Sequence, residues 1–239
     1  MHHFRHNMDI LPMSQQRLWP ELRSAPSLGF TLYGGTALAL RLGHRQSVDF
    51  DFFSENSLDR RAINAALPFV KRSTTIQDQD NTWVVQVPCE QCEREYVKVS
   101  FFGTITFGRV GEPEFTDDGV LQVASFEDLL ATKVKVILQR AEAKDYRDVA
   151  ALISKGLCLS QGLASARLLF GKSFQPSECL KALVYFRDGD LNTLTAAEKA
   201  TLIDAVKAVG DLPEAVLRST SLSGVMAQRP TGGPCTYLL

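Results

Sequence analysis

The pattern of apolar and polar positions divides the chain into a mixed first half and a helical second half. Before residue 125, strand-like runs at 30–33, 48–53, 82–87 and 96–102 alternate with helix-like runs at 9–23, 36–42 and 58–70. Beyond it, a 3.6-residue period predicts helices at 126–153, 160–170, 177–187, 195–209 and 213–218. We therefore predict an α/β (α+β) fold, with a mixed-sheet domain at 1–124 and a helical domain at 125–239.

Single residues mark the ends of several of these elements. Gly34 and Gly35 break the first strand, Thr36 is placed to cap the following helix, and Gly43 ends it. Ser125, with an acidic residue three positions later, gives the long second-half helix a capping-box-like start. Residues 103–120 are rich in Gly, Pro and acids, which predicts loops with room for one edge strand.

Asp49 and Asp51 form a candidate metal site. They lie two residues apart on a predicted strand, so their side chains share one face, while Val48, Phe50 and Phe52 are expected to point into the core. Two carboxylates this close repel each other unless a cation lies between them. Mg²⁺ suits this position because it binds one or two carboxylates together with substrate phosphates. The alternative is a solvated pair on an edge strand.

The residues around this pair could bind phosphate. Gly34 and Gly35 let the backbone approach a phosphate closely, and the helix that follows directs its N-terminal N–H groups to the same place. Thr36 could add a hydroxyl contact. Arg45 could hold a triphosphate, and Ser47 could bond a carboxylate or the turn. The competing interpretation is a strand-to-helix turn with a solvent-facing arginine and a turn serine.

A second charged group lies in the predicted helix 126–153. Lys133 and Arg140 are seven residues apart and would share a face, and Asp145 and Asp148 are three apart and would be neighbours. Such a helix could deliver cations to a phosphate. A salt-bridged, exposed helix face is the alternative that the pattern alone leaves open.

Composition narrows the class of protein. The chain has 239 residues, 45% hydrophobic and 22% charged, which is ordinary for a globular domain. A net charge of -1 excludes a generic nucleic-acid binder, so any anion site must come from local basic residues. No apolar run approaches the roughly 20 residues that span a bilayer. Five cysteines without framework spacing predict reduced thiols and a cytoplasmic location, and the Cys89–Cys92 pair is expected to be incidental in a hairpin turn.

Taken in order, these motifs resemble a known family. The series runs from Gly34-Gly35-Thr36 through Arg45, Ser47, Asp49 and Asp51 to Lys133, Arg140, Asp145 and Asp148. It is similar to that of the AbiEii/AbiGii-type nucleotidyltransferases, which are toxins of bacterial abortive-infection and toxin–antitoxin systems in the polymerase-β-like superfamily. The resemblance covers roughly residues 30–155.

The resemblance implies a nucleotidyltransferase-fold mixed sheet with flanking helices, followed by a helical bundle. It implies Mg²⁺-dependent transfer of a nucleoside monophosphate from an NTP to an acceptor, with RNA such as a tRNA end as the expected acceptor and an antitoxin as a possible partner. Asp49 and Asp51 would hold the metal. Gly34, Gly35 and Thr36 would bind the triphosphate and Lys133 would contact phosphate. Asp145 would act in catalysis with Asp148 as its partner.

One departure leaves alternatives open. Many superfamily members carry a third carboxylate on a later strand, where this chain has Lys98 and Ser100. Either Asp145 substitutes for that acid or the site is weakened. A catalytically degenerate nucleotide- or partner-binding module is therefore the competing hypothesis, and transfer to a small molecule such as an aminoglycoside is a third.

Overall fold

A computed structural model describes residues 2–89 and 95–224. Its helices are α1 (Met13–Leu18), α2 (Gly34–Leu42), α3 (Arg60–Ala66), α4 (Phe126–Ile137), α5 (Ala143–Ser154), α6 (Leu159–Phe170), α7 (Pro176–Leu183) and α8 (Ala196–Lys207). Its strands are β1 (His3–Phe4), β2 (Thr31–Tyr33), β3 (Asp49–Phe53), β4 (Thr74–Gln79), β5 (Thr82–Pro88), β6 (Tyr96–Phe102), β7 (Glu114–Thr116) and β8 (Gln122–Val123). The predicted mixed α/β architecture is confirmed.

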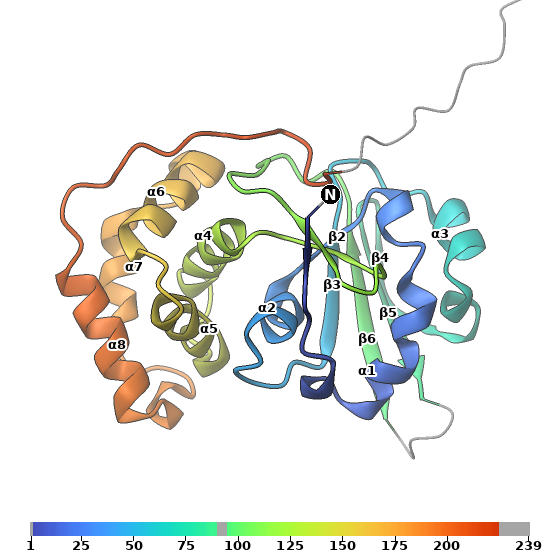
Figure 1. The fold of residues 1–239 in the computed structure, drawn as a ribbon, viewed down its shortest axis with the longest axis horizontal. Coiled ribbons are helices and arrows are strands. Elements are labelled where there is room, and N and C mark those ends of the chain that lie inside the picture. The colour runs from blue at the N-terminus through green and yellow to red at the C-terminus, as the bar shows by residue number, and fades with distance from the viewer. Residues whose placement is uncertain (1, 90–94, 225–239) are drawn as a thin grey trace, which may run out of the picture.

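The strands form one mixed sheet in the order β1-β7-β8-β2-β3-β6-β5-β4. At its centre β3 runs antiparallel to β2 and parallel to β6. Helix α2 covers one face of the sheet and α1 and α3 lie on the other, while α4 to α8 gather beyond α2 (Figure 1). The expected boundary at residues 124 and 125 falls between β8 and α4.

The two faces of β3 have different environments. Phe50 and Phe52 are fully buried, as predicted, and Phe50 packs against Trp19, which follows α1. Asp49, Asp51 and Phe53 alternate with them and therefore face α2 and the helical half. The expectation for Val48 is wrong: it precedes the strand and is 58% exposed, because the regular alternation begins only at Asp49.

The predicted helix 126–153 is two helices. α4 ends at Ile137 and α5 begins at Ala143, so Arg140 lies in the connecting loop and does not share a helix face with Lys133. The turn lets both helices bury an apolar stripe, including Leu130 and Val134 of α4 and Val149 of α5, in the same core. Charged residues from the two helices meet across this turn.

Other boundaries also differ from the prediction. α2 begins at Gly34 with Tyr33 as its N-cap, so Thr36 lies inside the helix and does not cap it. The polar strand β4 and the two-residue strands β1 and β8 carry too few apolar positions to be predicted. The helix expected at residues 213–218 is wrong, because these residues form neither a helix nor a strand.

The segment after α8 ties the two halves together. Residues 211–224 run back along the helices to the sheet, close to the start of the chain (Figure 1). The backbone of Ser219 pairs with that of Arg109 in an isolated antiparallel β-bridge. Leu222 is fully buried, and its N–H donates to Glu55 Oε2 at 3.1 Å. One hydrophobic cluster includes buried residues of both halves. Within the described ranges, no helix has the length and apolarity needed to cross a membrane.

Candidate functional site

A cavity of about 730 Å³ lies between the sheet and the helical half. Its walls are the start of α2, the loop at 45–48, the strands β3, β6, β5 and β4, α4 with the loop that follows it, and the first turn of α5. In the described ranges of the chain its charged lining consists of two carboxylates and five cations: Asp49, Asp51, Arg45, Lys98, Lys133, Arg140 and Lys144. The cavity is therefore suited to a strongly anionic ligand.

Both predicted metal-binding aspartates face this cavity. β3 presents Asp49 and Asp51 on the face that lines it. Burial raises the pKa of Asp51, and the neighbouring charge of Asp49 raises it further, while Lys98, Ser100 and Lys133 act in the opposite direction. Burial is the larger cause of the raised pKa, and the like-charge repulsion from Asp49, which a bound cation would relieve, is the smaller one.

The glycines bring the start of α2 against these groups. A Cβ on Gly34 would lie 2.6 Å from Asp51 Oδ2, and Gly34 has a φ of +76°, which other residues rarely adopt. A Cβ on Gly35 would lie 2.7 Å from an Arg45 guanidinium nitrogen and 2.9 Å from Ser47 Oγ. The predicted phosphate-binding residues Gly34, Gly35, Arg45 and Ser47 are thus brought together at one wall of the cavity.

Thr36 has a different environment from these neighbours. Its side chain is buried, and its hydroxyl donates to the backbone carbonyl of Asp49. The hydroxyl therefore fixes α2 against β3 at the carboxylate pair.

Asp148 is a fully buried carboxylate with three cationic or polar partners. Arg45 donates to it through Nε at 2.6 Å and Nη2 at 2.7 Å, Lys133 Nζ lies 2.6 Å from Oδ2, and His44 Nε2 lies 2.8 Å from Oδ1. Burial alone would raise the pKa of Asp148, but His44, Lys133 and Arg45 outweigh it and hold the pKa well below its usual range. Asp148 thereby fixes two cations that line the cavity.

Asp145, one turn before Asp148 in α5, also holds cations that line the cavity. Lys133 Nζ donates to its Oδ1 at 2.8 Å and Arg140 Nε to its Oδ2 at 2.8 Å. Its burial opposes ionisation, but the bonds from Arg140 and Lys133 prevail and lower its pKa. The hydrogen bond from Arg140 to Asp145 correspondingly raises the pKa of Arg140. Asp145 and Asp148 lie behind the cavity wall, and their cationic partners Arg45, Lys133 and Arg140 belong to it.

Lys98 is a site residue whose partner the sequence did not reveal. In the parallel pairing of β3 with β6, Asp49 is opposite Lys98 and Asp51 is opposite Ser100. Lys98 Nζ lies 2.8 Å from Asp49 Oδ2, and the Ser100 hydroxyl lowers the pKa of Asp51. His44, as a partner of Asp148, was also missed. Both pairings depend on strand register and loop path, which residue spacing does not encode.

The residues present fit a cation that binds together with a nucleotide. Among the described side chains, His, Cys, Asp and Glu nowhere gather in threes as a protein-only metal site. Asp49 and Asp51 nevertheless present two mutually repelling carboxylates to a cationic cavity. That donor set suits Mg²⁺, which completes its shell with water and substrate phosphates.

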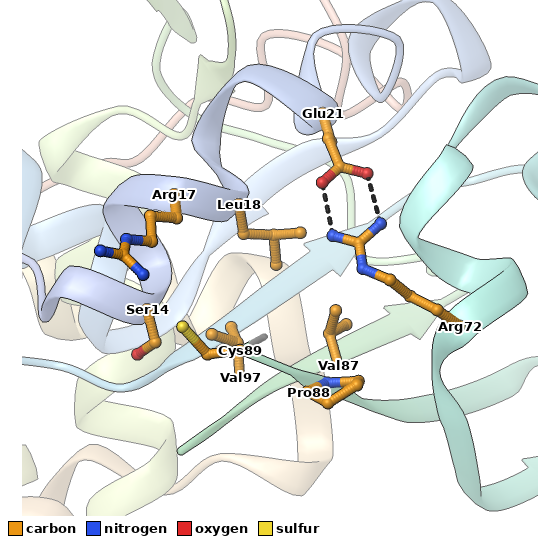
Figure 2. A pocket seen from close by; sticks show the side chains of 9 residues that line it. All are labelled: Ser14, Arg17, Leu18, Glu21, Arg72, Val87, Pro88, Cys89 and Val97. Atoms are coloured by element: carbon orange, nitrogen blue, oxygen red, sulfur yellow. Dashed lines mark hydrogen bonds and ion pairs between the residues drawn. The ribbon is translucent and has the colours of Figure 1, made fainter. Parts of the chain in front are cut away.

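A second cavity, of about 330 Å³, lies on the opposite face of the sheet beside α1 (Figure 2). Its Arg72 is held by Glu21, with Nη1 2.8 Å from Oε2, and Leu18, Val87 and Val97 are buried around it. Cys89 at the edge of this cavity is disulfide-bonded, so the expectation of a reduced thiol at this position is wrong. Cys92, the other cysteine of the Cys89–Cys92 motif, lies outside the described residues. Asp49 and Asp51 do not line this cavity, and we assign it no chemistry.

Comparisons with known proteins identify the family to which the chain is similar. The profile of the family described as "Nucleotidyl transferase AbiEii toxin, Type IV TA system" matches residues 17–216. The chain is 31% identical over 176 residues to uncharacterized protein aq_aa25 of Aquifex aeolicus (strain VF5), which covers 70% of this chain and 80% of that protein.

Two solved structures share the fold. A presumed nucleotidyltransferase from H. pylori superposes with a TM-score of 0.55 at 18% identity, over 82% of this chain and 92% of its own. MenT4, a nucleotidyltransferase toxin from Mycobacterium tuberculosis H37Rv, superposes with a TM-score of 0.56 at 17% identity, over 82% and 85% of the two chains. At these identities the likeness establishes the fold alone.

Proposed function

The chain belongs to the AbiEii nucleotidyl transferase toxin family, and we propose that its cavity transfers a nucleoside monophosphate from an NTP to RNA in a Mg²⁺-dependent reaction. The observation that carries the proposal is the cavity itself, in which two carboxylates line a pocket whose other charged residues, among those described, are cationic. A nucleotidyltransferase is the enzyme class of this family.

In the proposed reaction, an acceptor hydroxyl oxygen forms a bond to the α-phosphorus. The bond from that phosphorus to the α–β bridging oxygen breaks, pyrophosphate leaves, and the hydroxyl proton passes to water in the cavity. Asp49 and Asp51 would hold Mg²⁺, which supplies positive charge against the triphosphate when it is bound. Gly34 and Gly35 would direct backbone N–H groups at a phosphate.

The cations in the cavity wall would neutralise the charge that develops on pyrophosphate. Lys133 and Arg45 line the cavity, and both are held in place by Asp148. Arg140 also lines the cavity and is held in place by Asp145. Groups fixed in advance stabilise developing charge without reorganising during the reaction. Asp145 is fully buried, bonded to two cations and has a lowered pKa, so we propose that it positions Lys133 and Arg140 and does not take a proton.

The charge of the cavity favours RNA as the acceptor. A small, acidic pocket would suit an aminoglycoside, which is a polycation, but the charged lining here has an excess of cations. RNA is a polyanion and gains from such a surface. The family's toxins belong to toxin–antitoxin systems, so we also propose a cognate antitoxin as a partner.

The test is incubation of the protein with each NTP labelled at the α-phosphorus, Mg²⁺ and total bacterial RNA. We expect one or more NTPs to label RNA, and Asp49→Asn to lower labelling by at least about 100-fold because the carboxylate pair is lost. Asp204→Asn, a matched change at an exposed aspartate of α8, should label RNA normally. Label in an added aminoglycoside but not in RNA would overturn the proposed acceptor.

A further inference from the structure

Lys98 is the cation that belongs to the carboxylate pair itself. Three other cations in the cavity wall form ion pairs with buried aspartates. Lys133 and Arg45 pair with Asp148, and Arg140 pairs with Asp145. Lys98 Nζ instead lies 2.8 Å from Asp49 Oδ2, inside the proposed metal site.

The position of Lys98 is set by the sheet. Parallel pairing with β3 places Lys98 opposite Asp49, and strand alternation directs its side chain to the same face as both aspartates. The side chain of Lys98 is 39% exposed and that of Asp49 is 32% exposed, so the pair is open to the cavity. An exposed ion pair of this kind adds little to the stability of the fold. Its main consequence is therefore its effect on the ligands that bind in the cavity.

The charge balance limits how many metal ions the pair can hold. Two carboxylates of the described chain line the cavity, and the Lys98 ammonium already neutralises one of them. Before any phosphate oxygen binds, the two aspartates, the Lys98 ammonium and one divalent cation carry a net charge of +1, and a second divalent cation would raise it to +3. A second divalent cation would need the same Asp49 oxygen or would lie within a few ångströms of the ammonium, which repels it.

We propose that Lys98 replaces a second divalent cation at the Asp49–Asp51 pair, so that the site binds one divalent cation, and binds it together with the nucleotide. The inference rests on the proposed nucleotidyl transfer and specifies how that site is charged. A lysine suits the role because its ammonium is a compact point charge on a flexible stem. Before the nucleotide binds, the Lys98–Asp49 pair competes with the metal for the same carboxylate.

The test counts bound Mn²⁺ by electron paramagnetic resonance and requires no acceptor and no turnover. Protein is held in excess over an NTP analogue whose α and β phosphorus atoms are joined by a methylene group. We expect one Mn²⁺ per bound analogue in the native protein. Lys98→Glu should bind two, because it adds a carboxylate and removes the ammonium.

Lys98→Met, measured without nucleotide, should bind Mn²⁺ at least about tenfold more tightly than the native protein, since the competing charge is gone. Lys181→Met is the matched control, because Lys181 is an exposed lysine of α7. Circular dichroism of each variant confirms that the fold is retained. For Lys98→Glu, nucleotide-free Mn²⁺ affinity should also rise.

Two Mn²⁺ per analogue in the native protein, or equal nucleotide-free affinity in the native protein and Lys98→Met, would overturn this inference. RNA labelling together with two Mn²⁺ would overturn it while leaving the proposed function intact. One Mn²⁺ per analogue without RNA labelling would uphold it and count against the proposed acceptor. No Mn²⁺ binding with any analogue would overturn both.

Discussion

At the scale of residues, the site contains pairs that the sequence predicts and pairs that it does not. Asp49 and Asp51 share a face because strand side chains alternate with a period of two, so their spacing was sufficient to place them together. The partners Lys98 and His44 come from register and loop path, and neither follows from spacing. Asp148 was predicted as a neighbour of Asp145, but its contact with Arg45 spans 103 positions in the sequence.

Because Asp148 is buried and paired with cations, we expect Asp148→Asn to lower stability in a pH-dependent way. Asp148→Asn leaves Arg45 without its buried counter-charge and Lys133 with Asp145 alone, so the free energy of unfolding at pH 7 should fall by about 3–5 kcal/mol. Because the pKa of Asp148 is lowered in the folded state, its contribution is present above the unfolded pKa of about 3.9 and is lost as pH falls through the folded pKa.

Urea unfolding from pH 7 to pH 3 measures this effect. The difference between the native protein and Asp148→Asn should shrink toward the acid end of the range. Asp204→Asn, at a largely exposed site, should follow the native curve throughout. A difference that stays constant with pH would show that Asp148 is not charged and paired in the folded protein.

At the scale of elements, apolar periodicity located most of the helices and the central strands but not every boundary. It failed at the turn between α4 and α5, because apolar residues continue on both sides of residues 138–142. It also missed β4, whose residues are all exposed and mostly polar, since an edge strand needs no apolar face. The turn matters for function, because it folds α5 back so that Asp145 and Asp148 reach Lys133.

A substitution in the first turn of α2 should weaken nucleotide binding. Gly35→Ala would place a methyl group 2.7 Å from the Arg45 guanidinium and 2.9 Å from Ser47 Oγ, so both must shift. We expect affinity for a non-transferable NTP analogue, measured by calorimetry, to fall by at least about tenfold. Gly210→Ala is the control, because no described atom lies within 4 Å of the added carbon. Equal affinities for both variants would exclude a phosphate-binding role for this turn.

At the scale of the whole molecule, the cavity exists because two halves of the chain are held against each other. The return of residues 211–224 to the sheet was not predicted from sequence, since few of its residues are apolar and its contacts are distant in sequence. Leu222 is fully buried there, while Leu217 in the same segment is 42% exposed. The segment therefore fastens the helical half to the half that carries Asp49 and Asp51.

Truncating Leu222 should weaken this attachment. Leu222→Ala is expected to lower the free energy of unfolding by about 2–5 kcal/mol, because it leaves a cavity between the segment and the sheet. Leu217→Ala makes the same chemical change at an exposed site and should alter stability by less than about 0.5 kcal/mol. Urea unfolding measures both, and equal losses in the two variants would contradict the proposed attachment.

The central claim is that this cavity breaks the bond between the α and β phosphates and moves the α-phosphate with its nucleoside. The most direct test runs one NTP in two parallel reactions, labelled at the α-phosphorus or at the γ-phosphorus, with Mg²⁺ and RNA. We predict that the α-label enters RNA and the γ-label leaves as pyrophosphate, in equal amounts. Appearance of the γ-label in RNA, or its release as inorganic phosphate without any α-label in RNA, would contradict the account.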